Sequence, residues 1–366
     1  MNKLLQNKYS LFGKRVEKTD GFTKILRKFI ANPIGHYILF GIIICIIGYI
    51  AGNKLMPDVI PYSWQSGLAT TFSFAIASVG FCLLMGYSGL ASLATGGFMG
   101  IGTYSVYYVM EVAGLPFIMA LLIAIAIAVG IGLIVGFISL RIEGIYLVIL
   151  TLGLSEILRQ VFVAVKDTIR ISGFQLFGME IERTSSIYVV TVMLVIIMII
   201  TNNLINSPTG RAMLAMKNST AAAQAMGINV TKYRLFAFVI CTLYAAVAGL
   251  MLMMTVRAQM ASIGTSVYAL LTSLNILAAV IIGGFKSIWG AVVGTFIMYG
   301  LESTLLINVE FLAKNPVIIT FVSGVLVILV VMFYPGGLAQ LLKEAINGIK
   351  KICKKIKERI YGKDLG

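Results

Sequence analysis

Long apolar blocks alternate with short polar segments along most of this chain. Many blocks contain about 18 residues or more, which is enough for a helix to cross a hydrocarbon core ~30 Å thick. The short alternating strands typical of a membrane β-barrel do not stand out. The pattern therefore predicts an all-α polytopic membrane protein with about ten transmembrane helices, at residues 36–52, 66–86, 90–110, 116–140, 145–165, 187–206, 235–256, 267–284, 288–308 and 317–334.

The apolar blocks divide the chain into three predicted regions. A basic tail (1–35) precedes the transmembrane domain (36–340), and a second basic tail (341–366) follows it. We find no cleavable signal peptide, because the first apolar block follows a polar tail and lacks a small-residue cleavage site. The last tail places isoleucines and leucines at helical spacing among lysines. We therefore expect it to lie along the inner membrane surface as an amphipathic helix.

Composition agrees with a lipid environment. Of 366 residues, 59% are hydrophobic and only 12% are charged, whereas soluble domains carry about 25% charged residues. The four cysteines form no close pair and there is one histidine, so neither a disulfide framework nor a metal site is indicated.

The basic residues predict an orientation. Residues 1–35 and 343–366 each hold eight Lys or Arg, and the 207–234 loop holds four more. With both termini in the cytoplasm, the positive-inside rule is satisfied, and it requires an even number of spans. The net charge of +15 then reflects orientation and attraction to anionic lipid, so we expect membrane lipid and no nucleic acid as a partner.

The longest predicted cytoplasmic loop, 207–234, contains two short helical stretches, Arg211–Lys217 and Thr220–Met226. Asn218 and Ser219 between them are favourable N-caps, and glycine is common just after a helix C-terminus, where Gly227 stands. Methionine side chains adapt to the groove of a partner. We therefore expect a docking surface for a soluble protein here, formed by Met213, Leu214, Met216 and Met226. An ordinary interfacial loop is the competing interpretation.

Glycines cluster in two places. One cluster runs from Gly86 to Gly102, and the other contains Gly283, Gly284, Gly290 and Gly294. Glycine permits close helix packing, and an interrupted helix can also expose backbone polar groups to a substrate near the midplane of the membrane. Packing is the simpler interpretation for any single glycine.

Ionisable residues inside predicted spans are rare and are functional candidates by default. Glu156 and Arg159 are three residues apart in the fifth predicted span, so they share a helix face. We expect both to face the bundle interior, either as a structural ion pair or beside a substrate. No catalytic constellation is evident. The segment 284–287 lacks the upstream glycine of a phosphate-binding loop, so any ATP must bind another subunit.

Five segments, in order, resemble the LivM-type permeases of branched-chain amino acid ABC importers. They are GYSGLASLATGGFMGIGTY at 86–104, GIYLVILTLGLSEILRQV at 144–161, SPTGRAMLAMKNSTAAAQAMGI at 207–228, IIGGFKSIWGAVVG at 281–294 and FYPGGL at 333–338. Three details depart from the family pattern. Thr95 stands where the family usually has His, Lys217–Thr220 where it reads Arg-Glu-Asn-Glu, and Ser172–Phe174 where it has Thr-Gly-Gly.

The resemblance implies a translocation subunit in a bacterial or archaeal cytoplasmic membrane, with no cofactor of its own and no enzymatic activity. It implies two ABC ATPase subunits that hold ATP and Mg²⁺, a second related permease (a heterodimer or a homodimer), and an extracytoplasmic solute-binding protein. Closure of the ATPases would act on the 207–228 loop and switch the bundle by alternating access. Urea, an amide or a nucleoside stay open as alternative substrates, and an ion-gradient-driven secondary transporter is the rival class.

Two sets of residues are predicted to carry this function. The predicted substrate pathway comprises Gly89, Ser92, Thr95, Gly97, Thr151, Glu156 and Arg159. The predicted ATPase-coupling set comprises Gly210, Arg211, Lys217, Ala221, Ala222 and Gly227.

Overall fold

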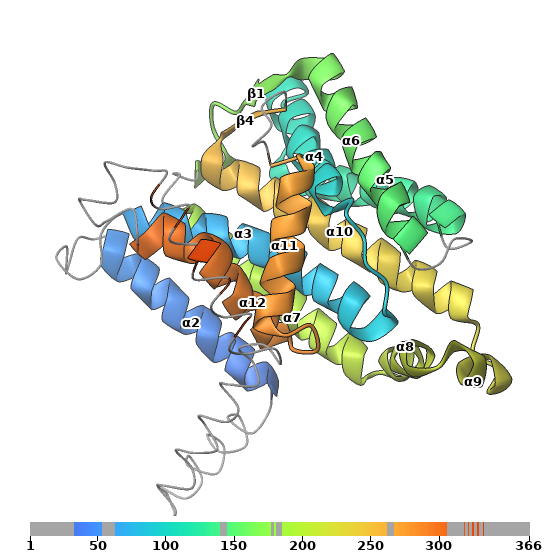
Figure 1. Cartoon of the computed structure of the whole chain (residues 1–366). Coiled ribbons are helices and arrows are strands. Elements are labelled where there is room, and N and C mark those ends of the chain that lie inside the picture. The colour runs from blue at the N-terminus through green and yellow to red at the C-terminus, as the bar shows by residue number, and fades with distance from the viewer. Residues whose placement is uncertain are drawn as a thin grey trace, which may run out of the picture.

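The computed structural model describes most of the predicted transmembrane domain as one helical bundle (Figure 1). The described residues are 33–52, 63–139, 145–176, 179–180, 185–261 and 267–305, with isolated helical positions at 318, 321, 324, 325, 328 and 332. Residues 1–32 of the predicted amino-terminal tail and the whole predicted amphipathic carboxy-terminal tail lie outside the described residues, while helix α2 (Pro33–Gly52) begins within the predicted tail, at Pro33. Most of the tenth predicted span also lies outside the described residues.

The described elements follow the predicted spans closely. They are α2 (Pro33–Gly52), α3 (Ser63–Leu83), the π-helical turn η1 (Leu84–Ser88), α4 (Thr95–Val106), η2 (Tyr107–Val112), α5 (Phe117–Ser139), α6 (Ile145–Lys166), α7 (Ser186–Asn206), α8 (Pro208–Asn218), α9 (Thr220–Ala225), α10 (Val230–Val256), α11 (Leu270–Gly283), α12 (Ile288–Thr295) and η3 (Phe296–Leu305). Within the described residues, six helical segments are long and apolar enough to cross a membrane.

Helices α3 and α10 form the centre of the bundle. α3 packs against α10, α7, α12 and η3, while α10 also packs against α4 and α5. Small residues on α3, such as Ala75 and Ala77, are completely buried. Small side chains allow helix backbones to approach closely, which favours association in lipid, where apolar burial alone gives no advantage.

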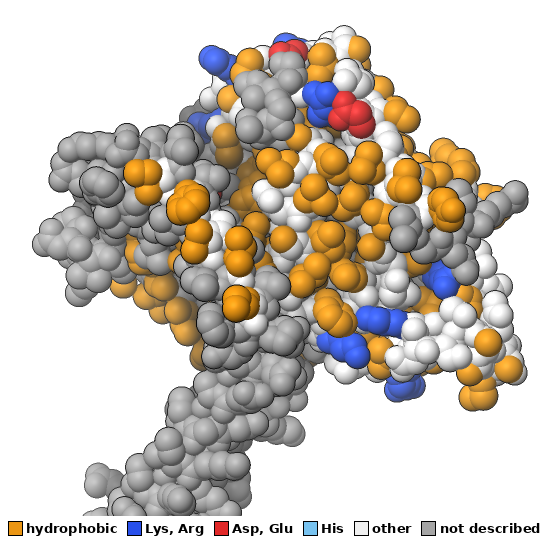
Figure 2. Space-filling view, viewed as in Figure 1, with side chains coloured by type: hydrophobic (Ala, Val, Ile, Leu, Met, Phe, Trp, Pro, Cys, Tyr) orange, Lys and Arg blue, Asp and Glu red, His pale blue; other side chains and the backbone are white. Residues whose placement is uncertain are grey.

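Helices α2, α5 and α6 lie at the periphery and expose apolar side chains. Ile134 on α5 is 64% exposed and Tyr146 on α6 is 72% exposed. Apolar side chains spread over much of the visible surface, while Lys and Arg lie mainly toward two opposite ends (Figure 2). This distribution suits a protein surrounded by lipid, because the exposed apolar surface needs no contact with water.

Two helix pairs depend on glycine at their closest approach. A Cβ on Gly102 of α4 would collide with the carbonyl oxygen of Ala246 on α10, and one on Gly249 would collide with that of Met99. Gly283 of α11 and Gly290 of α12 likewise each lie against the other's carbonyl oxygen. Gly283 and Gly290, in the second glycine cluster of the sequence, therefore serve helix packing, which was the simpler of the two interpretations.

The mainly helical chain also contains short strands, which the all-α prediction did not include. β1 (Thr168–Arg170) pairs antiparallel with β4 (Ala258–Met260), and β2 (Gln175–Leu176) pairs with β3 (Met179–Glu180). The β1–β4 pair joins the segment after α6 to the segment after α10 at the end of the bundle away from α8 and α9 (Figure 1). Strand pairing between two loops leaves no signal in the hydrophobic pattern of either.

Candidate functional site

The chain between α3 and α4 is broken inside the bundle. η1 ends at Ser88, Gly89 adopts a positive φ of 75°, and α4 begins only at Thr95. The irregular segment 90–94 is largely buried and runs back along the bundle toward the start of α4 (Figure 1). Irregular backbone at membrane depth is tolerated only where protein or a polar cavity surrounds it. The interrupted helix that the first glycine cluster predicted is present.

Contacts with α6 place this break well inside the bundle. The backbone N–H of Leu93 donates to Oγ1 of Thr151 at 3.0 Å. A Cβ built on Gly97 would lie 3.2 Å from Cα of Ser155. These two α6 positions lie roughly 9–15 Å along the helix from its beginning, at 1.5 Å per residue. The first turn of α4 is therefore at an intermediate depth and not at the bundle surface.

A second helix begins at the same place. α11 starts at Leu270, and its residue Ser273 accepts a hydrogen bond from the N–H of Gly96 at 2.8 Å. A Cβ on Gly96 would lie 3.0 Å from the carbonyl oxygen of Ala269, the N-cap of α11. Neither N-cap, Ala94 or Ala269, supplies a side-chain cap. We call this meeting of two helix N-termini the α4–α11 junction; it comprises residues 92–97, 155 and 269–273.

Two buried hydroxyls at the junction find no hydrogen-bond partner among the described residues. Oγ1 of Thr95, on a residue that is 3% exposed, and Oγ of Ser155, on a residue that is 1% exposed, are both unpaired. Thr151 and Ser92 are also buried, but both bond to the 93–94 backbone. Buried polar atoms are normally paired, so unpaired hydroxyls in a polar, glycine-rich setting mark a place where a polar solute could bind.

The junction could hold an anionic or hydrogen-bonding group. Free N–H groups at a helix N-terminus carry partial positive charge and bind carboxylates readily. The sequence predicted Ser92, Thr95, Gly97 and Thr151, which the structure brings together, and Gly89, which lies instead at the α8 end of the broken segment. Sequence reasoning missed Ser155 and Ser273. The four-residue spacing of Thr151 and Ser155, which places both on one face of α6, was the available signal for Ser155.

Glu156 and Arg159 form the ion pair that their spacing predicted. Arg159 donates to both carboxylate oxygens of Glu156, at 3.0 and 2.6 Å, and to the carbonyl oxygen of Ala261 at 3.1 Å. The Glu156 side chain is 46% exposed, so the expectation that it faces the bundle interior is wrong. Its neighbours on α6, Ile157 and Val161, are also exposed. The pair ties α6 to the segment after β4, which favours the structural interpretation.

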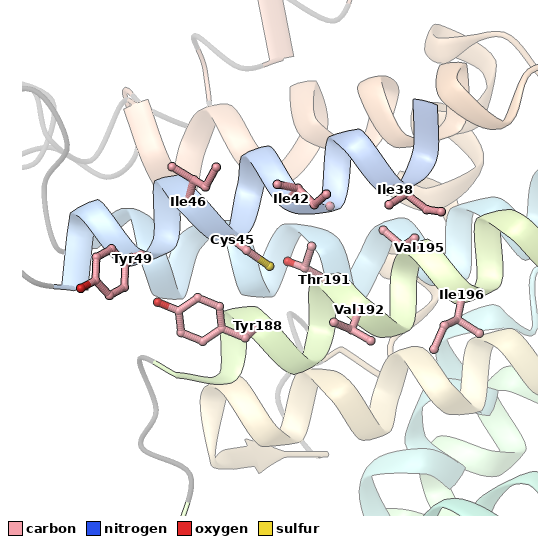
Figure 3. Close-up of a pocket in the computed structure, with 11 residues that line it drawn as sticks. Ile38, Ile42, Cys45, Ile46, Tyr49, Tyr188, Thr191, Val192, Val195 and Ile196 are labelled. Carbon is pink, nitrogen blue, oxygen red and sulfur yellow. The ribbon is translucent and has the colours of Figure 1, made fainter. Parts of the chain in front are cut away.

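A hollow between α2 and α7 is different in character (Figure 3). Its volume is about 510 Å³, and it is lined by Ile38, Gly41, Ile42, Cys45, Ile46, Tyr49, Tyr188, Thr191, Val192, Val195 and Ile196. Tyr49 and Ile46 are more than half exposed. The lining carries no charged side chain and opens to the periphery. It therefore suits an apolar chain better than a polar solute.

The 207–234 loop forms the two predicted helices at one end of the bundle (Figure 1). Ser207 caps α8 by accepting from Gly210 N, and Ser219 caps α9 by accepting from Ala222 N. Gly227, with a φ of 79°, follows the C-cap of α9. The two predicted helices and the glycine stop are confirmed, although α8 begins at Pro208, three residues before the predicted start at Arg211.

The exposed face of α8 and α9 is not the docking surface that was predicted from the methionines. Met213 and Met216 are completely or almost completely buried, whereas Met226 is 82% exposed. The first two methionines attach α8 to the bundle and cannot contact a partner. Among the predicted coupling residues, Arg211, Ala221, Ala222 and Gly227 are exposed. Gly210 is buried, and Lys217 is partly buried.

Lys217 points toward the bundle. Its Nζ donates to the carbonyl oxygens of Met85 and Gly86 at 3.0 and 2.8 Å, and it lies 4.7 Å from the ring centroid of Phe285. Partial burial, together with nearby Lys286, lowers the pKa of Lys217 below its usual value. Among the described residues, no cluster of His, Cys, Asp or Glu could hold a metal ion.

A bundle with a polar break at its centre and exposed helices at one end is the arrangement of a membrane transport subunit. The family described as branched-chain amino acid transport system / permease component matches residues 64–331. The chain therefore belongs to this family, and it is a multi-pass membrane protein of the transport class.

Two curated relatives support the assignment. The chain is 26% identical to the high-affinity branched-chain amino acid transport system permease protein LivM of Escherichia coli (strain K12), over 77% of this chain and 72% of the relative. It is 25% identical to the protein of the same description from Salmonella typhimurium, over 76% and 70% respectively. No solved structure matches the chain significantly. The family resemblance that five sequence segments indicated is confirmed.

Proposed function

We propose that this chain is the permease subunit of an ABC importer that carries branched-chain amino acids across a bacterial or archaeal cytoplasmic membrane. Two ATPase subunits would hold ATP and Mg²⁺, and a second related permease would complete the pathway as a heterodimer or a homodimer. A solute-binding protein would deliver the substrate from outside. The proposal includes ten spans with both termini in the cytoplasm.

The α4–α11 junction is the observation that carries the proposal. It is a buried polar region where two helix N-termini meet, and the hydroxyls of Thr95 and Ser155 find no partner there among the described residues. A branched-chain amino acid is a zwitterion with an apolar side chain. Its carboxylate fits helix N-termini, and its side chain fits the surrounding apolar helices. Interrupted helices at intermediate depth are used in this way by transporters.

The exposed part of α8 and α9 supports coupling to a soluble partner. Arg211, Ala221 and Ala222 lie on this exposed face, at the end of the bundle where positive charge is expected inside the cell. Small side chains such as those of α9 permit close contact with a groove on the partner. ATPase closure would then move α8 and α9 relative to the bundle.

Uptake of labelled leucine tests the proposal directly. The chain would be reconstituted with its two ATPases and its second permease in proteoliposomes, and loaded binding protein would be added outside. We expect ATP-dependent uptake that unlabelled valine and isoleucine compete and urea and nucleosides do not. If only urea or a nucleoside competed, the chain would still be an importer subunit, but its substrate would not be a branched-chain amino acid. Uptake by this chain alone, driven by an ion gradient and independent of ATP, would show a secondary transporter instead.

Charge reversal on the exposed face tests the coupling surface. We expect the double variant Arg211→Glu, Ala222→Glu to lose ATPase binding and uptake while inserting normally in the membrane. Gly210 is unsuitable for this test, because a Cβ there would collide with the carbonyl oxygen of Ile205. Normal uptake by the double variant would place the ATPase contact elsewhere.

A further inference from the structure

Lys217 occupies the last turn of α8, yet its charge is directed away from the exposed docking face. Its two hydrogen bonds go to the carbonyl oxygens of Met85 and Gly86 in η1. The carbonyl groups at a helix C-terminus lack partners within the helix and carry partial negative charge. The ammonium group therefore joins α8 to the end of the α3–η1 helix, just before the chain breaks.

The lysine side chain also packs on the break itself. A Cβ built on Gly89 would lie 3.2 Å from Cγ of Lys217, and the positive φ at Gly89 turns the chain back toward the junction. Residues 90–94 then lead directly to Thr95. Only the five residues 90–94 therefore separate the Lys217 contact at Gly89 from the first turn of α4.

The turn between α11 and α12 also contacts η1. The hydroxyl of Tyr87 donates to the carbonyl oxygen of Lys286 at 3.2 Å, and a Cβ on Gly86 would collide with the carbonyl oxygen of Phe285. η1 therefore contacts both α8, through Lys217, and the α11–α12 turn, and Lys217 also lies against Phe285 of that turn. A shift of α8 must move η1 or break the Lys217 contacts.

The charges around Lys217 allow its hydrogen bonds to η1 to form and break. Among the described residues, the positive charge of Lys286 repels that of Lys217. In the part of the chain that the structure describes, the Glu156–Arg159 pair is the one salt bridge, so no carboxylate neutralises Lys217. Breaking its bonds to two carbonyl oxygens leaves no uncompensated buried anion behind. An ion pair in the same place would resist separation more strongly.

We propose that Lys217 is the link that transmits ATPase-driven movement of α8 and α9 to the broken helix and so to the α4–α11 junction. The proposal rests on the proposed importer function. Within the predicted ATPase-coupling set, it assigns Lys217 a positioning role inside the permease.

The test compares Lys217→Met with Lys217→Arg and with Lys232→Met in the reconstituted complex. Methionine keeps the packing of the side chain but removes the charge and its donors. Arginine can still donate to both carbonyl oxygens. Lys232 is an exposed lysine in the first turn of α10, and it serves as the matched control. For each variant, leucine uptake, ATP hydrolysis and retention of the ATPases during purification are measured together.

We expect Lys217→Met to lower uptake about tenfold, since hydrogen bonds from a charged donor are lost. The ATPases should stay bound and hydrolyse ATP, so that more ATP is consumed per leucine. Lys217→Arg should recover most uptake, and Lys232→Met should resemble the unchanged complex. Normal coupling in Lys217→Met overturns the proposal, and so does loss of ATPase binding in both Lys217 variants. Absence of ATP-dependent uptake in the unchanged complex would instead refute the importer function.

Discussion

The α4–α11 junction and the α2–α7 hollow each contain a buried threonine hydroxyl, Thr95 in the first and Thr191 in the second, with no partner in the part of the chain that the structure describes. Their surroundings differ. Thr95 lies at a helix N-terminus beside Ser155, Ser273 and the irregular backbone of residues 90–94. Thr191 lies within a regular helix among apolar side chains that open to the periphery (Figure 3). An unpaired hydroxyl therefore indicates a solute site only where other polar groups converge on it.

The comparison also shows how a membrane protein arranges polarity. The peripheral helices present apolar side chains to their surroundings, whereas serine, threonine and irregular backbone lie at the centre. In a soluble protein this arrangement would expose apolar surface and bury polar groups at a cost. In lipid this arrangement keeps the polar groups away from hydrocarbon, and it leaves them available to line a substrate pathway.

Closing the junction should give the largest effect. Gly96→Ile places a branched side chain between the starts of α4 and α11, where a Cβ already lies 3.0 Å from the carbonyl oxygen of Ala269. We expect leucine uptake to fall about 100-fold or more, from the cost of overpacking. Gly153→Ile on α6 is the matched control, because a Cβ there meets nothing within 4 Å. Equal uptake by the two variants would mean that the pathway avoids the junction.

Removing the unpaired hydroxyls should give an intermediate effect. We expect Thr95→Val and Ser155→Ala each to lower uptake about tenfold, because a hydrogen bond to a charged substrate group is lost. Thermal stability should not fall, since neither hydroxyl has a partner among the residues that the structure describes. Thr151→Val is the contrasting variant: it leaves Leu93 N unpaired and should cost about 1–3 kcal/mol of stability. Unchanged leucine uptake by both hydroxyl variants would argue against a solute site.

Neutralising the peripheral ion pair should give a small effect. Glu156→Gln removes the carboxylate but leaves the bond from Arg159 to the carbonyl oxygen of Ala261. Half-exposed pairs contribute little, so we expect uptake to change less than about threefold. The measurement is leucine uptake at several substrate concentrations. A tenfold rise in the half-saturating concentration of leucine would show that Glu156 belongs to the substrate pathway after all.

The same change in the apolar hollow should give the smallest effect. Thr191→Val has the chemistry of Thr95→Val, and Thr191 is equally unpaired. We expect uptake to match that of the unchanged protein and thermal stability to stay equal or rise slightly, because an unsatisfied buried hydroxyl is removed. If Thr191→Val impaired uptake as strongly as Thr95→Val, the distinction drawn between the two regions would be wrong.

The sequence alone determined the membrane class, the positions of nine of the ten predicted helical stretches, and the two helices of the 207–234 loop. These features depend on local pattern: apolar length, caps such as Ser219, and a glycine stop at Gly227. They can be predicted because hydrophobic length and capping act on neighbouring residues. The family was also recognisable, since short motifs in a fixed order survive where overall identity is low.

Tertiary structure decided what those segments do. It brought Ser155 and Ser273, which are far apart in the sequence, to the first turn of α4. It also buried Met213 and turned Lys217 inward, and it left Glu156 half exposed. Which face of a helix meets another helix cannot be predicted from hydrophobicity when both faces are apolar. In lipid, close packing of small residues and the placement of a few polar groups make that choice.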